Sequence, residues 1–163
     1  MSKEIVQRVL IDLDRCVECG SCAAACYGSH SRMPIIQSAR QGPALLPLIC
    51  RQCKAASCVD ACPVQAMRRD DNGVVQRALS LCIGCGSCAR ACPFGVLPND
   101  VTRRQIAKCD LCADRTADGS AVPRCVAACP SGALQFADEH KAIEDKLLEV
   151  GGRTTGQHPF KRR

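Results

Sequence analysis

The chain has 163 residues, of which 16 are Cys and only four are aromatic, and its formal net charge is +6. Leu, Ile, Val and Phe together make up only about a fifth of the chain, which is too little for a conventional hydrophobic core, so we expect groups bound by the cysteines to fill the interior. The positive charge does not indicate nucleic-acid binding, because the aromatic side chains that stack on bases are scarce. No apolar run approaches the roughly 18 residues of a membrane helix.

In chain order, the first predicted element is a strand over residues 8–14, where apolar and polar side chains alternate. A short helix is expected to begin at residues 23–26. Residues 27–47 contain three Pro and two Gly and are expected to form a long connecting loop. A β-hairpin is expected over residues 66–77, with Asn72-Gly73 in a type I′ turn.

The C-terminal part of the chain mixes the same kinds of element. Residues 113–124 are predicted to form a polar loop and residues 133–136 a closing strand. A helix is predicted over residues 139–150, with Asp138 as its N-cap and apolar side chains on one face. The basic tail, residues 151–163, has little apolar surface to bury and is expected to be flexible. Together these elements predict an α+β fold with long loops and a C-terminal helix.

The compartment bears on the chemistry of the cysteines, because sixteen Cys could form disulfides only in an oxidising environment. Residues 1–8 contain neither the apolar segment nor the small-residue cleavage site of a signal peptide. Unless a partner subunit carries an export signal, we expect a cytoplasmic protein. Its thiols should then stay reduced and bind metal.

The cysteines form four groups of four. Groups one and three have the spacing C-x2-C-x2-C-x3-C, which is typical of bacterial ferredoxins that bind [4Fe–4S] clusters. The second gap widens to four residues in group two and to twelve in group four, and groups two, three and four end in Cys-Pro. The groups are, in chain order, Cys16, Cys19, Cys22 and Cys26; Cys50, Cys53, Cys58 and Cys62; Cys82, Cys85, Cys88 and Cys92; and Cys109, Cys112, Cys125 and Cys129. The sequence therefore predicts four [4Fe–4S] clusters as cofactors.

Short gaps between the ligands have a physical reason. Three thiolates from one loop can wrap a cubane, and Gly20 and Gly86 allow a tight backbone whose amides point at the sulfurs. Group four alone could instead bind zinc, but two strict ferredoxin spacings and three Cys-Pro ends favour iron–sulfur clusters throughout. Four oxidised clusters with their thiolates contribute about −8, which brings the formal +6 to about −2.

Spacing leaves the pairing of the groups open. Two half-modules that exchange their fourth Cys form a two-cluster ferredoxin domain, and the pairs could be tandem (one with two, three with four) or nested (two with three, one with four).

Outside the groups no catalytic residue is predicted: the three His are expected at the surface. The sequence has no Gly-rich phosphate-binding loop, so a flavin or nicotinamide must sit on a partner.

Three of the cysteine motifs resemble a known family. They are Cys50-Arg-Gln-Cys53 followed by Cys58-Val-Asp-Ala-Cys62-Pro, Lys108-Cys-Asp-Leu-Cys112 followed by a wide gap, and a first group that ends in Cys26-Tyr27 without Pro. In this pattern the chain is similar, over residues 9–137, to the four-cluster iron–sulfur subunits of complex oxidoreductases. Such subunits serve molybdenum and tungsten pterin enzymes, [NiFe] hydrogenases and carbon monoxide dehydrogenases.

The resemblance implies two ferredoxin-like modules that are nested in the sequence. The outer module would comprise residues 1–46 plus 98–150, the inner module residues 47–97, and the tail residues 151–163. Each cluster would take three ligands from one group and the fourth from another. The implied ligand sets are Cys16, Cys19, Cys22 and Cys129 for cluster 1; Cys50, Cys53, Cys58 and Cys92 for cluster 2; Cys82, Cys85, Cys88 and Cys62 for cluster 3; and Cys109, Cys112, Cys125 and Cys26 for cluster 4.

The resemblance further implies electron transfer as the function, with no catalysis by the chain itself. The expected partners are a catalytic subunit of the molybdenum or tungsten pterin class that oxidises aldehyde or formate, and a flavin or other redox subunit. The short chain looks most like the small subunit of a tungsten-containing aldehyde oxidoreductase complex. We expect a hetero-oligomer with its buried interface at Ile35-Ile36 and residues 44–48, and open-ended self-association into chains as an alternative.

Other functions remain as alternatives. The chain could be a free polyferredoxin carrier, or the iron–sulfur subunit of a hydrogenase or carbon monoxide dehydrogenase. A zinc-binding interaction module is the remote alternative, and a visible spectrum would separate it from the others, because only iron–sulfur clusters colour the protein brown.

Overall fold

The computed structural model describes residues 7–30, 35–41, 44–97, 108–138 and 148–149 of the chain. Its elements are short, and the mixture of helices and strands confirms the expected α+β class. In chain order they are β1 (Arg8–Ile11), α1 (Ser21–Ser29), β2 (Gln37–Gln41), β3 (Ala44–Leu48), α2 (Ser57–Asp60), β4 (Met67–Arg69), β5 (Val75–Arg77), α3 (Ser87–Ala91), α5 (Ala113–Thr116), α6 (Arg124–Ala127), β6 (Leu134–Ala137) and β7 (Leu148–Glu149).

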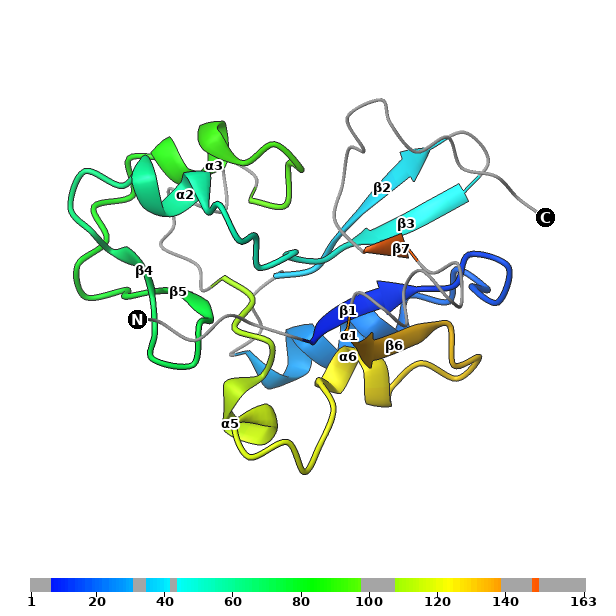
Figure 1. Cartoon of the computed structure of the whole chain (residues 1–163). Coiled ribbons are helices and arrows are strands. Elements are labelled where there is room, and N and C mark those ends of the chain that lie inside the picture. Colours follow the sequence, from blue (N-terminus) through cyan, green and yellow to red (C-terminus); the bar gives the residue numbers. More distant parts are fainter. Residues whose placement is uncertain (1–6, 31–34, 42–43, 98–107, 139–147, 150–163) are drawn as a thin grey trace.

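One group of elements combines the beginning of the chain with its C-terminal part (Figure 1). Strand β1 pairs antiparallel with β6, with Val9 opposite Phe136 and Ile11 opposite Leu134, which confirms the strands expected in 8–14 and 133–136. Helices α1 and α6 contact each other beside this sheet. Cysteines lie among the apolar side chains of the core that these elements enclose. Its buried residues are Val9, Ile11, Cys26, Ile35, Ile36, Ile49, Leu111, Cys125 and Leu134.

A second group of elements comes from the middle of the chain and repeats this plan. Strands β4 and β5 pair antiparallel, with Met67 opposite Arg77, which confirms the hairpin expected at 66–77. Helices α2 and α3 contact each other, and α2 also contacts β4; Figure 1 shows these four elements together at the left. The buried residues of their core are Ala56, Met67, Val75, Cys88, Val96 and Leu97. Each core thus consists of a strand pair, two short helices and cysteines.

The turn of the β4–β5 hairpin is not the type I′ turn expected at Asn72-Gly73. Gly73 has a φ of 84°, but Asn72 is not among the residues with positive φ, whereas a type I′ turn needs both. The Gly73 N–H donates to the carbonyl of Asp70 (3.0 Å). The Asp70 Oδ1 accepts from the N–H groups of Asn72 (3.0 Å) and Val74 (2.8 Å). The carboxylate of Asp70 therefore favours a type I turn followed by a left-handed Gly.

The connector 27–47 is not the loop that its Pro and Gly content predicted. Helix α1 continues to Ser29, and β2 pairs with β3 in a hairpin, with Gln37 opposite Leu48. Ile35 and Ile36 are only 8% and 7% exposed and belong to the first core. The expectation that these two residues form a subunit interface is therefore wrong, because the fold itself already covers them.

The region after β6 also differs from the sequence-based expectation. Residues 148–149 were predicted as the end of a helix but form β7, in which Leu148 pairs with Ile11 and Glu149 with Leu10. Strand β1 has a second edge whose backbone groups need partners, and β7 provides them. Residues 139–147 and the tail 151–163 lie outside the described residues. The polar loop 113–124 begins with one helical turn, α5.

Within the ranges that the structure describes, no helix is long and apolar enough to cross a membrane.

Candidate metal centres

The first Cys-x-x-Cys loop of each of the four groups has the same backbone conformation. The residue that precedes the second Cys has a left-handed backbone in every loop, with a φ of 56° at Glu18, 50° at Gln52, 68° at Gly84 and 58° at Leu111. Only Gly84 could have been anticipated from residue type, because the other three side chains disfavour positive φ. Strained backbone persists where the surrounding structure requires it, and it gathers at functional sites. The repetition indicates that all four loops are shaped for the same purpose.

A second conformation recurs at the three Cys-Pro ends. In each, the N–H of the third residue after the Cys donates to the Cys carbonyl; the donors are Gln65 (3.3 Å), Gly95 (3.3 Å) and Gly132 (3.2 Å). These three residues also have positive φ, of 52°, 64° and 63°. Pro suits the second position of such a turn because its φ is already fixed. The preceding helices α2, α3 and α6 end one or two residues before the cysteine, and the turn that contains the Pro follows.

Group one lacks this Pro, and the structure shows the consequence. Helix α1 continues past Cys26 through Tyr27 to Ser29. His30 then closes the helix, because its backbone N–H (3.1 Å) and its ring Nδ1 (2.9 Å) both reach the carbonyl of Cys26. The expectation that His30 is a surface residue is wrong, since only 15% of its side chain is exposed.

Cysteines from different groups line common cavities. Each of three cavities is lined by three Cys of one group and one Cys of another. These are Cys16, Cys19, Cys22 and Cys129; Cys50, Cys53, Cys58 and Cys92; and Cys62, Cys82, Cys85 and Cys88.

The remaining four cysteines also lie close together. Burial and the neighbouring thiolate of Cys112 raise the pKa of Cys26 to about 11. Burial, Cys112 and Cys26 raise the pKa of Cys125 to about 12. Burial and the charge of Cys50 raise the pKa of Cys109 well above its ordinary value, and Cys125 adds to the effect. Each of these three thiols therefore lies near at least one other member of the set, and Cys109 also lies near Cys50 of group two. The positive charge of a bound metal would lower the pKa of its thiol ligands instead.

Two polar side chains are buried where the second and fourth groups meet. Gln52 is 1% exposed; its amide accepts from the N–H of Val75 (2.7 Å) and donates to the carbonyl of Cys109 (2.8 Å). The Lys108 Nζ donates to the carbonyls of Val75 (2.5 Å) and Cys109 (2.9 Å). Burial by itself lowers the pKa of Lys108. The negative charges of Cys50 and Cys109 raise it by more than burial lowers it, so the pKa lies above its ordinary value. The sequence analysis did not identify either residue as part of a site.

In groups one and three the exposed cysteine forms a hydrogen bond with the serine two residues later. Arg77 donates from Nε (3.2 Å) and Nη2 (2.8 Å) to the Sγ of Cys82, and a charge-assisted bond of this kind favours a thiolate. Hydrogen bonds with Ser21 lower the pKa of Cys19, and hydrogen bonds with Ser87 lower the pKa of Cys85. The two loops with ferredoxin spacing therefore hold their exposed cysteines in the same way.

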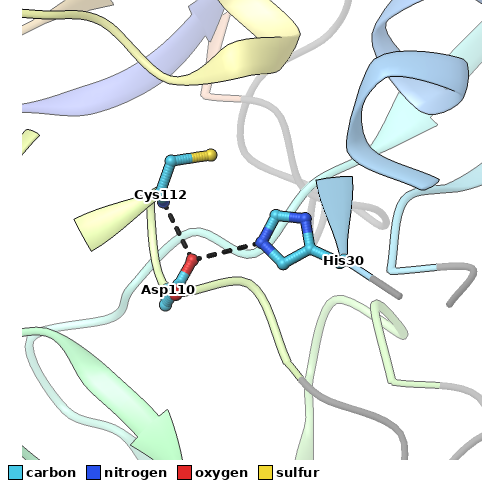
Figure 2. Close-up of side chains that lie close together, drawn as sticks. All are labelled: His30, Asp110 and Cys112. Atoms are coloured by element: carbon cyan, nitrogen blue, oxygen red, sulfur yellow. Dashed lines mark hydrogen bonds and ion pairs between the residues drawn. The ribbon is translucent and has the colours of Figure 1, made fainter. Parts of the chain in front are cut away.

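His30, Asp110 and Cys112 form a compact cluster beside the fourth set (Figure 2). The His30 Nε2 lies 3.6 Å from the Asp110 Oδ1, which also accepts from the N–H of Cys112 (2.9 Å). Their potential ligand atoms lie within 4.8 Å of one another. Because Cys112 also lies with Cys26 and Cys125, this cluster belongs to the same site.

The donor set fits iron–sulfur clusters. All sixteen cysteines are free thiols, and loops with positive φ turn backbone N–H groups toward sulfur, as in Gly84 N–H to Cys82 Sγ (3.4 Å). Thiolates that receive amide hydrogen bonds are the usual environment of such clusters.

Known families and proteins match this chain. Residues 42–139 match a family described as "4Fe-4S dicluster domain", and residues 7–27 match one described as "4Fe-4S binding domain". The chain is 36% identical over 141 residues to the thiosulfate reductase electron transfer subunit PhsB of Salmonella typhi, which covers 78% of this chain and 73% of that protein. It is 34% identical over 173 residues to the electron transport protein HydN of Escherichia coli (strain K12), which covers 90% and 95%. The cofactors are therefore [4Fe–4S] clusters, and the sixteen cysteines fit four of them.

Proposed function

This chain belongs to the family of 4Fe-4S dicluster proteins, and on that premise we propose that it carries electrons between a catalytic subunit and a second redox subunit through four clusters. Bound [4Fe–4S] clusters supply one-electron transfer, whereas the protein sets their spacing, potentials and docking. The observation that carries the proposal is that cysteines far apart in the sequence gather in sets of four. The chain itself catalyses no reaction in this proposal.

We assign the ligands to the four sets that the resemblance implied. Three sets are supported by the cavities that their members line. The fourth is supported by the proximity of its members, which raises the pKa of Cys26, Cys125 and Cys109. Cluster 1 is held by Cys16, Cys19, Cys22 and Cys129; cluster 2 by Cys50, Cys53, Cys58 and Cys92; cluster 3 by Cys62, Cys82, Cys85 and Cys88; and cluster 4 by Cys26, Cys109, Cys112 and Cys125. Tandem pairing would instead combine cysteines of group one with those of group two, and cysteines of group three with those of group four.

The proposed clusters follow one another in the order 1, 4, 2, 3. Cys22 is close enough to Cys26 to affect its pKa, which supports the neighbourhood of clusters 1 and 4. Cys50 affects the pKa of Cys109 in the same way, which supports the neighbourhood of clusters 2 and 4. Helices α2 and α3 carry ligands of clusters 2 and 3 and contact each other. The proposed modules, residues 1–46 plus 98–150 and residues 47–97, are supported by the two separate cores, except that Ile49 of the inner module packs in the core of the outer one.

The two end clusters are the ones that we propose to face partners. Cys19 of cluster 1 and Cys85 of cluster 3 are exposed. Apolar side chains beside them are also exposed, with Val17 at 64% and Ile83 at 62%. Exposed apolar groups beside a redox centre suit a protein contact that excludes water. Each end of the proposed chain of clusters therefore reaches the surface.

The identity of the partners is the finer part of the proposal. A catalytic subunit of the molybdenum or tungsten pterin class and a flavin or other redox subunit fit the two ends. The relative named as the electron transfer subunit of thiosulfate reductase supports a subunit rather than a free polyferredoxin. A tungsten-containing aldehyde oxidoreductase is one catalytic subunit of this class that we propose as a partner. A cytoplasmic location belongs to the proposal, because the ligands must stay reduced.

Anaerobic purification from the native host tests this function. The purified complex should contain about sixteen iron and sixteen sulfide per copy of this chain beyond those of its partners. Native mass measurement should show the chain bound to a catalytic subunit. A brown monomer that copurifies with no other polypeptide would support the free carrier instead, and a colourless protein with zinc would exclude both.

A further inference from the structure

Lys108 is an unusual residue for the interior of this protein. It is only 4% exposed, although lysine is almost never fully buried without a partner. Its Nζ bonds to two backbone carbonyls, those of Val75 and Cys109. Carbonyls orient an ammonium group but do not neutralise it. A buried charge needs an opposite charge nearby.

No carboxylate of the described residues forms an ion pair with Lys108; the ion pairs described join His30 to Asp110 and Arg124 to Asp114. The anionic groups near Lys108 are thiolates: Lys108 lines the same cavity as Cys50, Cys53, Cys58 and Cys92, and its Nζ bonds to the carbonyl of Cys109. Cys50 and Cys58 belong to the proposed cluster 2, and Cys109 to cluster 4. The positive charge thus lies between two sites that become more negative on reduction.

We propose that the positive charge of Lys108 raises the reduction potentials of both cluster 2 and cluster 4. The two clusters in the middle of the row can then be reduced more easily. The inference rests on the ligand sets proposed above. A fixed positive charge stabilises an added electron, and the effect is strong where water is excluded. One cation placed between two clusters acts on both, whereas Arg77 bonds to Cys82, a ligand of cluster 3.

Lys54 offers a matched control. It follows Cys53, a ligand of cluster 2, directly in the sequence, but it is exposed. Water and salt screen an exposed charge. Lys54→Met therefore changes the net charge of the protein by the same amount as Lys108→Met, but it removes no buried charge.

The experiment compares the Lys108→Met, Lys108→Arg and Lys54→Met variants of the full chain in redox titrations followed by electron paramagnetic resonance. Lys108→Met should lower the potentials of two clusters, and each redox equilibrium should move at least about tenfold, or about 59 mV for one electron. Lys108→Arg should restore most of the shift, and Lys54→Met should change the equilibria less than about twofold. Unchanged potentials in Lys108→Met, or equal shifts in both Met variants, would overturn the inference.

A variant-free measurement covers the case in which Lys108→Met does not assemble. Lysine with a nitrogen isotope label at Nζ should give a hyperfine coupling to reduced clusters in the unsubstituted chain, and the coupling should be absent in Lys108→Arg. A missing coupling overturns the role of Lys108. Fewer than four clusters in the unsubstituted chain would instead overturn the proposed function, so the two failures are distinguishable.

Discussion

The replacement of a single fourth ligand tests the proposed sets most directly. Cys129 follows α6 near the end of the described chain, but it lines the cavity of Cys16, Cys19 and Cys22. We expect Cys129→Ala to damage the cluster of group one, because it removes one of four thiolates from that cavity. Under tandem pairing the same substitution would damage the cluster held by group three.

The size of the effect follows from the ligand count. A cluster left with three thiolates either loses one iron and becomes a three-iron cluster or is lost completely. The total should therefore fall from about sixteen iron to between roughly fifteen and twelve. A larger loss would show that the substitution disturbs the fold and not one cluster.

The assay is iron and sulfide analysis combined with electron paramagnetic resonance of the reduced protein. Cys62→Ala is the complementary variant, because Cys62 lines the cavity of group three. Ser131→Ala is the matched control, since its hydroxyl lies 3.7 Å from the Cys129 Sγ but is no ligand in the proposal; it should keep all four clusters. If Cys129→Ala removes the signal of the group-three cluster and Cys62→Ala removes that of the group-one cluster, the nested sets are refuted.

Three further predictions concern stability. Gln52→Leu should destabilise the protein by about 1–3 kcal/mol, because the N–H of Val75 loses its bond to Gln52; an unchanged temperature of cluster loss under anaerobic heating would contradict this. Leu111→Gly relieves about 1–2 kcal/mol of backbone strain, but the side chain is buried and its loss costs about 2–5 kcal/mol. The variant should thus be less stable in chemical denaturation, and equal or higher stability would show that strain dominates. Removal of iron by a chelator should abolish cooperative unfolding, because cluster binding supplies the folding free energy; a sharp calorimetric transition in the iron-free chain would contradict it.

Local patterns were sufficient for much of this protein. Cysteine spacing predicted the four loops and their type of cofactor. Alternation of apolar and polar residues predicted β1, and the Asn-Gly pair marked the β4–β5 hairpin, although not its turn type. These features depend on residues close together in the chain. Even so, the left-handed backbone at Glu18, Gln52 and Leu111 could not be predicted, because these residue types disfavour it and only the required shape of the loop imposes it.

Contacts between distant segments lay beyond the reach of spacing. Spacing alone left tandem and nested pairing equally open, whereas the folded chain brings Cys129 beside the first group and Cys62 beside the third. The connector formed a hairpin, and its Ile35 and Ile36 entered a core because apolar side chains from both ends of the described chain meet there. Lys108 could be read as a surface charge until its surroundings were known. Local backbone preferences are encoded in neighbouring residues, but burial and the meeting of thiolates depend on how the whole chain packs.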